Sequence, residues 1–86
     1  MEKNVKVVRV KKDAFRMIEL GRRNYVIRPL SEGYHSGDTI MMREYDCSFT
    51  GKGAIAEILS ICAGELGLNG GYQIVSFGMV RLCSEN

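Results

Sequence analysis

The sequence predicts one small α+β domain. Two observations lead to this prediction: runs rich in β-branched or alternating apolar residues, typical of strands, lie near both ends of the chain, and between them the apolar period changes to that of a helix. A chain of 86 residues has room for one hydrophobic core, so residues 1–86 are expected to form a single domain. With 45% hydrophobic and 26% charged residues, that domain is expected to be ordered.

The first strand is expected at residues 5–10, VKVVRV, because valine favours extended structure. Val7 and Val8 are adjacent and interrupt the alternation of the run. Adjacent apolar residues in a strand predict either burial on both faces or a bulge, and the sequence does not decide between these.

A helix of two to three turns is expected next, because the apolar period changes after residue 11. This helix is expected to begin at Lys12 or Asp13 and to end before Gly21, a residue type that fits the left-handed position after a last turn. Its apolar face consists of Ala14, Phe15, Ile18 and, at the margin, Met17.

The middle of the chain predicts two strands separated by a loop. NYVIRPL, residues 24–30, is extended, with Pro29 at a strand end, an edge or a bulge. Residues 30–37 contain serine, two glycines and no apolar period, which predicts a loop. DTIMMREYD, residues 38–46, alternates in the manner of a strand.

The last third of the chain leaves two alternatives open. The apolar residues of GAIAEILSICAGEL, residues 53–66, fall on one helical face, and its alanine, leucine and glutamate favour a helix. YQIVSFGMVRLC, residues 72–83, predicts one long strand or two strands joined at Gly78, where the missing side chain permits a bulge or a close backbone approach.

Charge is distributed unevenly along the chain. Residues 1–45 hold ten Lys and Arg against six Asp and Glu, a net charge of +4, whereas residues 46–86 hold two against four, a net charge of −2. A basic half can attract a phosphate backbone, and an ordinary solvated surface explains the same split. No apolar run reaches the roughly 18 residues of a membrane span, and no signal peptide is recognised, so a cytoplasmic protein without a membrane partner is expected.

Metal chemistry is not expected from the cysteines. They are odd in number, widely spaced and free of any CxxC pair, which argues against a disulfide framework and a zinc site. Glu44 and Asp46 flank Tyr45 and would share a face if the strand continued, so they could be paired carboxylates for acid–base or metal chemistry or simply mark the end of the strand. The strand end is preferred, and neither a metal nor a cofactor is predicted.

The order of elements and a short motif resemble the ASCH domains of the PUA-like superfamily. The ASCH signature, GxKxxExR followed by GD, is matched here at Gly21, Arg28, Gly37 and Asp38, with Arg23 in the lysine position and Val26 in the acidic position. GDTIMMREYD, FTGKGAIAEIL and GLNGGYQIVSF further resemble a small ASCH-like family of unknown function found in phages and bacteria, over residues 6–82. This resemblance implies that residues 53–62 form a strand, and hence an α+β, small PUA-like (ASCH) β-barrel of about five strands with one short N-terminal helix.

The resemblance also raises an enzymatic alternative. Some ASCH proteins resemble a bacterial amidohydrolase that deacetylates N4-acetylcytidine with a lysine and a threonine of the motif and a distant glutamate. Arg23 and Val26 stand at the lysine and threonine positions here, and Glu57 and Glu65 are the candidates by position for the glutamate. Because arginine stays protonated and valine has no hydroxyl, no catalytic residue is predicted, and hydrolysis of a modified nucleoside is kept as the alternative.

The preferred prediction is a non-enzymatic binding module for RNA or a nucleotide-like ligand, in a cleft between the helix and the barrel. Arg23 and Arg28 are expected to contact phosphate or base edges, since a guanidinium offers a planar fork and stacks on bases. Asn24 is expected to contact a base edge, and Ser31 and His35 to line the loop side of the cleft.

Two of these residues have competing structural explanations. Arg28 could instead form an internal salt bridge with Asp38 or Glu44, and His35 could be merely exposed. A third possible function is a protein-interaction component of a phage or mobile element, with a homodimer formed by a self-paired edge strand.

Overall fold

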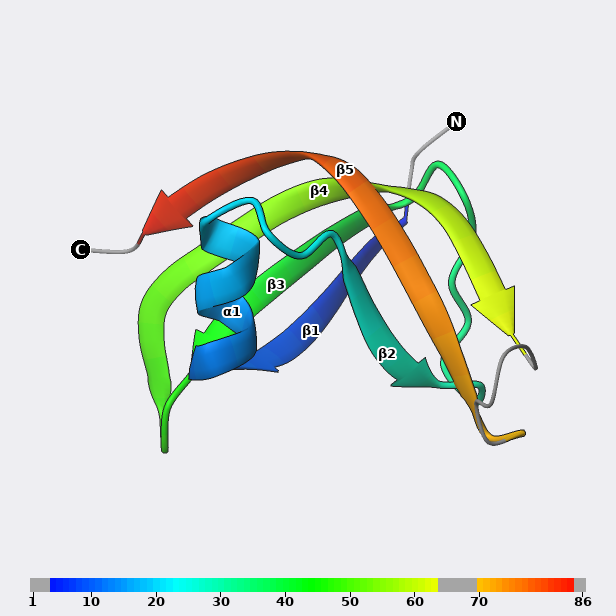
Figure 1. Cartoon of the computed structure of the whole chain (residues 1–86), viewed down its shortest axis with the longest axis horizontal. Helices are drawn as coiled ribbons and strands as arrows, with labels where there is room; N and C mark the ends of the chain where they lie inside the picture. Colours follow the sequence, from blue (N-terminus) through cyan, green and yellow to red (C-terminus); the bar gives the residue numbers. More distant parts are fainter. Residues whose placement is uncertain (1–3, 64–69, 85–86) are drawn as a thin grey trace.

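The computed structural model describes residues 4–63 and 70–84. Five strands and one helix follow one another along the chain (Figure 1). In order, these elements are β1 (Val5–Lys11), α1 (Lys12–Glu19), β2 (Tyr25–Pro29), β3 (Thr39–Tyr45), β4 (Phe49–Ala63) and β5 (Tyr72–Ser84).

All five strands belong to one sheet in the order β1-β3-β4-β5-β2. β1 and β3 are parallel, and every other neighbouring pair is antiparallel. The sheet curls into a half-barrel, as Figure 1 shows, and β1 and β2, its two edge strands, line one groove together. The expected number of strands and the single short helix are therefore confirmed.

α1 covers one end of the half-barrel because its apolar face fits the inner surface of the sheet. Phe15 and Ile18 are buried, and the helix packs against β1 and β3. α1 begins at Lys12, and Gly21, with a φ of 74°, follows it in the left-handed conformation that the sequence predicts. Met17, expected at the margin of the apolar face, is 39% exposed.

β1 is a regular edge strand without the irregularity that its adjacent valines predict. Val8 and Val10 are buried in the core, whereas Val7 is 65% exposed. The register with β3 runs without a shift from Val5 to Lys11, so there is neither a bulge nor burial on both faces. The physical reason is that no described element covers the outer face of β1, so Val7 stays in solvent.

β4 is a strand, as the resemblance implies and as helix propensity does not. It pairs with β3 on one side and β5 on the other, and these ladders outweigh the helical preference of its alanine, leucine and glutamate. Its buried side chains follow a period of two at Ala54, Ala56 and Ile58. The end of the ambiguous segment, residues 64–66, lies outside the described residues.

β5 is one long strand with an irregularity near Gly78. The β4–β5 register shifts between Ile55 and Glu57, opposite Arg81 and Gly78. Next to this shift, Met79 has a left-handed backbone conformation with a φ of 55°. Gly78 allows the Leu59 side chain to lie close to its backbone, since a Cβ at Gly78 would lie 2.8 Å from Leu59 Cδ1.

The core fills the concave side of the half-barrel, under α1. Its largest fully buried side chains are Phe15, Phe77, Ile40, Met42, Ile58 and Val75. No helix in the described part of the chain is long and apolar enough to cross a membrane.

Candidate functional site

A groove of about 280 Å³ lies where the two edge strands of the sheet face each other. We call it the edge groove. Residues from β1, α1 and the segment around β2 line it: Val8, Arg9, Val10, Lys11, Ala14, Arg23, Val26, Ile27 and Arg28. Four of these residues are basic and none is acidic, so positive charge gathers around a groove that also has apolar lining residues.

Arg9 and Arg23 are each stacked on a tyrosine. The Arg9 guanidinium lies 4.6 Å from the centroid of the Tyr45 ring, and the Arg23 guanidinium lies 4.6 Å from that of Tyr25. Arg23 Nε also donates a hydrogen bond of 3.1 Å to the Tyr25 carbonyl oxygen. Stacking fixes the guanidinium plane while its N–H groups point sideways, which is the arrangement that phosphate recognition uses.

Arg28 is held by a paired contact with Glu32 in the following loop. Arg28 Nε donates to Glu32 Oε1 at 2.8 Å, and Nη2 donates to Oε2 at 2.6 Å. The Tyr34 hydroxyl also donates to Glu32 Oε1. An internal salt bridge therefore exists, but with Glu32 and not with Asp38 or Glu44, the partners expected from the sequence.

These contacts shift the pKa values of all three groups. The hydrogen bonds from Arg28 lower the pKa of Glu32, and the same contact raises the pKa of Arg28. Burial raises the pKa of Tyr34 to about 12, so its hydroxyl stays protonated as a donor at neutral pH. An anionic ligand that used the Arg28 fork would have to compete with the Glu32 carboxylate.

Gln73 fixes the start of the loop that carries Glu32. Its side-chain amide is buried at 4% residue exposure and donates to the carbonyl oxygens of Pro29, at 2.9 Å, and Glu32, at 2.8 Å. Sequence reasoning missed this residue. The signal was available, because Gln73 shares the inward face of β5 with Val75 and Phe77, where a polar side chain needs partners.

The other predicted site residues do not line the edge groove. Asn24 is exposed, and its carbonyl oxygen accepts a 2.9 Å hydrogen bond from the Phe77 N–H. Ser31 and His35 are exposed on the loop of residues 30–37. His35 Nδ1 lies 3.8 Å from Asp38 Oδ2, with the His35 side chain 77% exposed. The edge groove thus brings together Arg23 and Arg28, and it adds Arg9 and Lys11, which the sequence did not single out.

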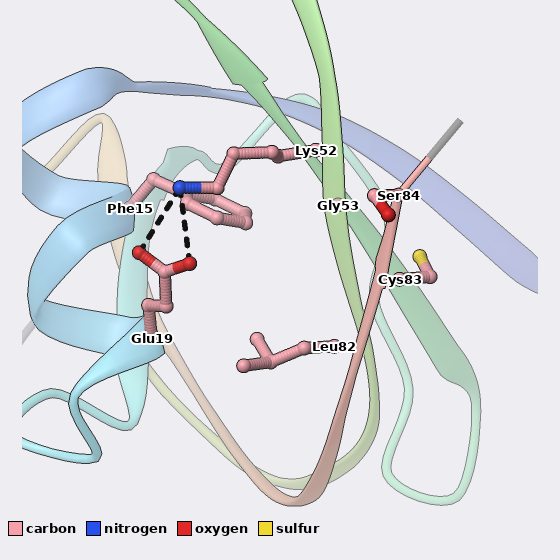
Figure 2. A pocket seen from close by; sticks show the side chains of 7 residues that line it. All are labelled: Phe15, Glu19, Lys52, Gly53, Leu82, Cys83 and Ser84. Atoms are coloured by element: carbon pink, nitrogen blue, oxygen red, sulfur yellow. Dashed lines mark hydrogen bonds and ion pairs between the residues drawn. The ribbon is translucent and has the colours of Figure 1, made fainter. Parts of the chain in front are cut away.

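A second groove, which we call the α1–β5 groove, runs between α1 and the C-terminal half of β5. It consists of two cavities of about 470 and 440 Å³ that share Glu19 and Leu82. Figure 2 shows the first cavity, where Lys52 reaches across from β4 to Glu19, with Nζ 3.0 and 3.2 Å from the two carboxylate oxygens. Arg23 and Asn24 line the far end of the second cavity.

Glu44 adds a second carboxylate to this cluster. Its side chain is 8% exposed, accepts a 2.7 Å hydrogen bond from Thr50 Oγ1, and lies 4.0 Å from Lys52 Nζ. Asp46 follows the end of β3 and pairs with Lys12 at 3.6 Å. Glu44 and Asp46 therefore have separate cationic partners and do not form a carboxylate pair.

The residues considered for amidohydrolase chemistry are not assembled in one place. Val26 is 5% exposed and belongs to the core. Glu57 lines a cavity with Thr39, Met79 and Arg81 rather than the edge groove. Glu65 lies outside the described residues. Within residues 4–63 and 70–84, no group of three or more His, Cys, Asp or Glu side chains is placed to hold a metal ion.

Comparison with known families gives a match over most of the chain. The model of a family described as a domain of unknown function (DUF3850) matches residues 5–77, from β1 into β5. A search of curated proteins found no match. The matched segment includes every residue that lines the edge groove.

Proposed function

The chain belongs to the DUF3850 family, and because that family is described as of unknown function, we propose from the edge groove itself that the protein is a binding module for RNA or a nucleotide-like ligand, without catalytic activity. We further propose that its half-barrel is of the ASCH type within the PUA-like superfamily. The motif residues Gly21, Arg28, Gly37 and Asp38 and the agreement of β4 with the strand that this resemblance implies support the assignment.

The observation that carries the functional proposal is the composition of the edge groove. Four of its lining residues are basic and none is acidic, although the whole chain has a net charge of only +2. Positive groups along a narrow groove with apolar walls raise the local concentration of anions. A mononucleotide or a single-stranded RNA supplies both the phosphate for these cations and a base for the apolar lining residues.

Each cation has a distinct role in this proposal. Arg9, Lys11 and Arg23 contact phosphate in this proposal, because all three residues line the groove and none of them forms an ion pair with an acidic side chain among the described residues. Arg28, fixed by Glu32, contacts a base edge or a second phosphate. A longer RNA leaves the groove past Arg28 towards the loop of residues 30–37, where Ser31 and His35 are exposed.

Salt-dependent binding of labelled RNA tests this proposal. Fluorescence anisotropy of a single-stranded RNA at several salt concentrations measures the association constant. Its logarithm is expected to fall linearly with the logarithm of the salt concentration, with a slope of about 0.7 for each phosphate neutralised. Arg23→Ala is expected to weaken binding and to lower this slope by the contribution of about one phosphate contact. Arg22→Ala is the matched control, since Arg22 is exposed, adjacent in sequence and absent from the groove lining.

Two results would contradict the proposal. Equal losses for Arg22→Ala and Arg23→Ala would show binding by general surface charge rather than by the groove. If neither the RNA nor a labelled nucleoside monophosphate bound, the nucleotide-like ligand would be removed as well. A DNA of the same sequence distinguishes recognition of the 2′-hydroxyl from recognition of phosphate alone.

The enzymatic alternative has its own test. Incubation with N4-acetylcytidine is expected to release no acetate above the uncatalysed rate, because Arg23 cannot readily give up a proton and Val26 has no hydroxyl. Release of acetate at an enzyme-catalysed rate would replace the binding proposal with a hydrolase.

A further inference from the structure

The C-terminal half of β5 has an unpaired outer edge. β2 pairs with β5 only from Tyr72 to Ser76, and the next backbone hydrogen bond on that side runs from the Phe77 N–H to the Asn24 carbonyl oxygen. Within the described part of the chain, no backbone group pairs with the outer edge of residues 79–84. An exposed strand edge of this length is a template for the addition of another strand.

Apolar side chains continue from this edge into the α1–β5 groove. Val80 and Leu82 line the groove and are 37% and 54% exposed, and Leu59 of β4 is 52% exposed beside them. The cavity next to Val80 and Leu59 has a volume of about 440 Å³, enough to accept an apolar side chain from an added strand. The edge and the groove therefore form one surface.

The other end of the same groove has an excess of negative charge. Glu19 and Glu44 share the single ammonium group of Lys52, and the Glu44 side chain is almost fully buried. Figure 2 shows Glu19 and Lys52 side by side at the wall of the 470 Å³ cavity, with Leu82 and Ser84 of β5 across from them. A second cation entering this cavity would balance the charge of the cluster.

Charge and symmetry favour a different protein over a second copy of this chain. A two-fold axis that pairs β5 with itself in antiparallel fashion leaves each copy's groove face on the same side of the joined sheet. The second copy would then bring Val80, Leu82 and Ser84 to this groove, and none of these is a cation. Arg81 faces the opposite side, where it lines a cavity with Glu57 and Met79.

We propose that residues 79–84 and the α1–β5 groove bind an extended peptide segment of a protein partner as an added strand, with a lysine or arginine beside Glu19 and an apolar side chain over Leu59 and Val80. Side chains on one face of a strand recur every second residue, so the segment carries a basic residue two positions from an apolar one. Arg23 lines both grooves, but the contacts proposed for the peptide are made by Glu19, Leu59 and Val80, so this inference does not depend on RNA binding.

Selection of peptides from a random library on the purified protein tests this inference. The enriched peptides are expected to share an apolar residue and a Lys or Arg two positions apart. Hydrogen exchange of the complex is expected to show slowed exchange at the amides of residues 79–84. Replacing the peptide's basic residue with norleucine is expected to weaken binding about tenfold, an effect that leaves the protein itself unchanged.

Protein variants then locate the charge contact. With Glu19→Gln, the basic and norleucine peptides are expected to bind alike, whereas Glu57→Gln, on the opposite face of the sheet, is expected to preserve the tenfold preference. The inference is overturned if no peptide is enriched, if the enriched peptides are acidic, or if protection falls outside residues 79–84. Sedimentation of a dimer whose residues 79–84 are protected without peptide would also overturn it, since a second copy would then occupy the edge.

Discussion

Gly53→Ala introduces a methyl group at a point of β4 where three neighbouring atoms leave little space. A Cβ at this position would lie 3.1 Å from Met41 Cε, 3.2 Å from Cys83 Sγ and 3.2 Å from the Met42 carbonyl oxygen. The methionine terminus and the exposed thiol can move, but Met42 O is part of the backbone of β3, next to β4 in the sheet. The substitution therefore strains the pairing of the two strands.

The size of the effect follows from two opposing contributions. Overpacking of a tightly filled site costs about 1 to 3 kcal/mol. Replacing glycine with alanine also reduces the conformational entropy of the unfolded chain, which stabilises the folded protein by about 0.4 to 1 kcal/mol. The net expectation is a loss of about 1 kcal/mol in the free energy of unfolding, which for a domain of this size lowers Tm by about 4 to 8 °C.

Gly78→Ala is the matched control in the neighbouring strand. A Cβ at Gly78 would meet only the Leu59 side chain, 2.8 Å away at Cδ1, and Leu59 is 52% exposed and can turn into solvent. The expected change is within about 0.5 kcal/mol. Thermal and urea unfolding followed by circular dichroism measure both variants. If Gly53→Ala were as stable as the native protein, or if both variants lost the same free energy, the steric reasoning would be wrong.

Three further predictions concern the loop and the core. Gln73→Leu is expected to cost about 1 to 3 kcal/mol and to speed hydrogen exchange in residues 30–37, because the Pro29 and Glu32 carbonyl oxygens lose their buried donor; unchanged exchange would contradict this. Glu32→Gln is expected to cost less than about 1 kcal/mol, since Glu32 is 36% exposed. The fold lowers the pKa of Glu32 below its usual 4.5, so the stability from its contact with Arg28 is present above pH 4.5 and is lost as the pH falls through the folded pKa; a difference in urea midpoint that did not shrink in acid would refute this. Ile58→Ala, at a site with no exposure, is expected to cost about 2 to 5 kcal/mol in urea unfolding, and a loss below 1 kcal/mol would show that the core relaxes.

Local pattern is enough to predict most of the elements. The helix after β1, its glycine stop, the proline at the end of β2 and the alternation of β3 all follow from residues close together in the chain. β4 is different, because its composition favours a helix and only its position between β3 and β5 makes it a strand. Family resemblance supplied that tertiary information, which residues 53–66 do not contain.

The candidate site was harder to predict, because it is made by contacts across the sheet. Arg23 and Arg28, which the sequence predicts to contact a ligand, both line the edge groove. Arg9 and Lys11 were missed, since they come from the opposite edge of the sheet and join the groove only through its curvature. The partner of Arg28 was also missed, because Glu32 reaches it through a loop whose path is set by the distant Gln73.

The placement of the two edge strands has a consequence for the order of folding. β4 and β5 are consecutive in the chain and pair along most of their length. β1 pairs with β3 and β2 pairs with β5, partners that are not the next strand in the chain, so the docking of β1 and β2 closes longer loops. We expect β1 and β2 to join last and to open first, which native-state hydrogen exchange would show as faster exchange at their amides than at those of β4 and β5. A ligand that spans the edge groove would hold these two late-forming strands together, so it would slow unfolding as well as shift the folding equilibrium.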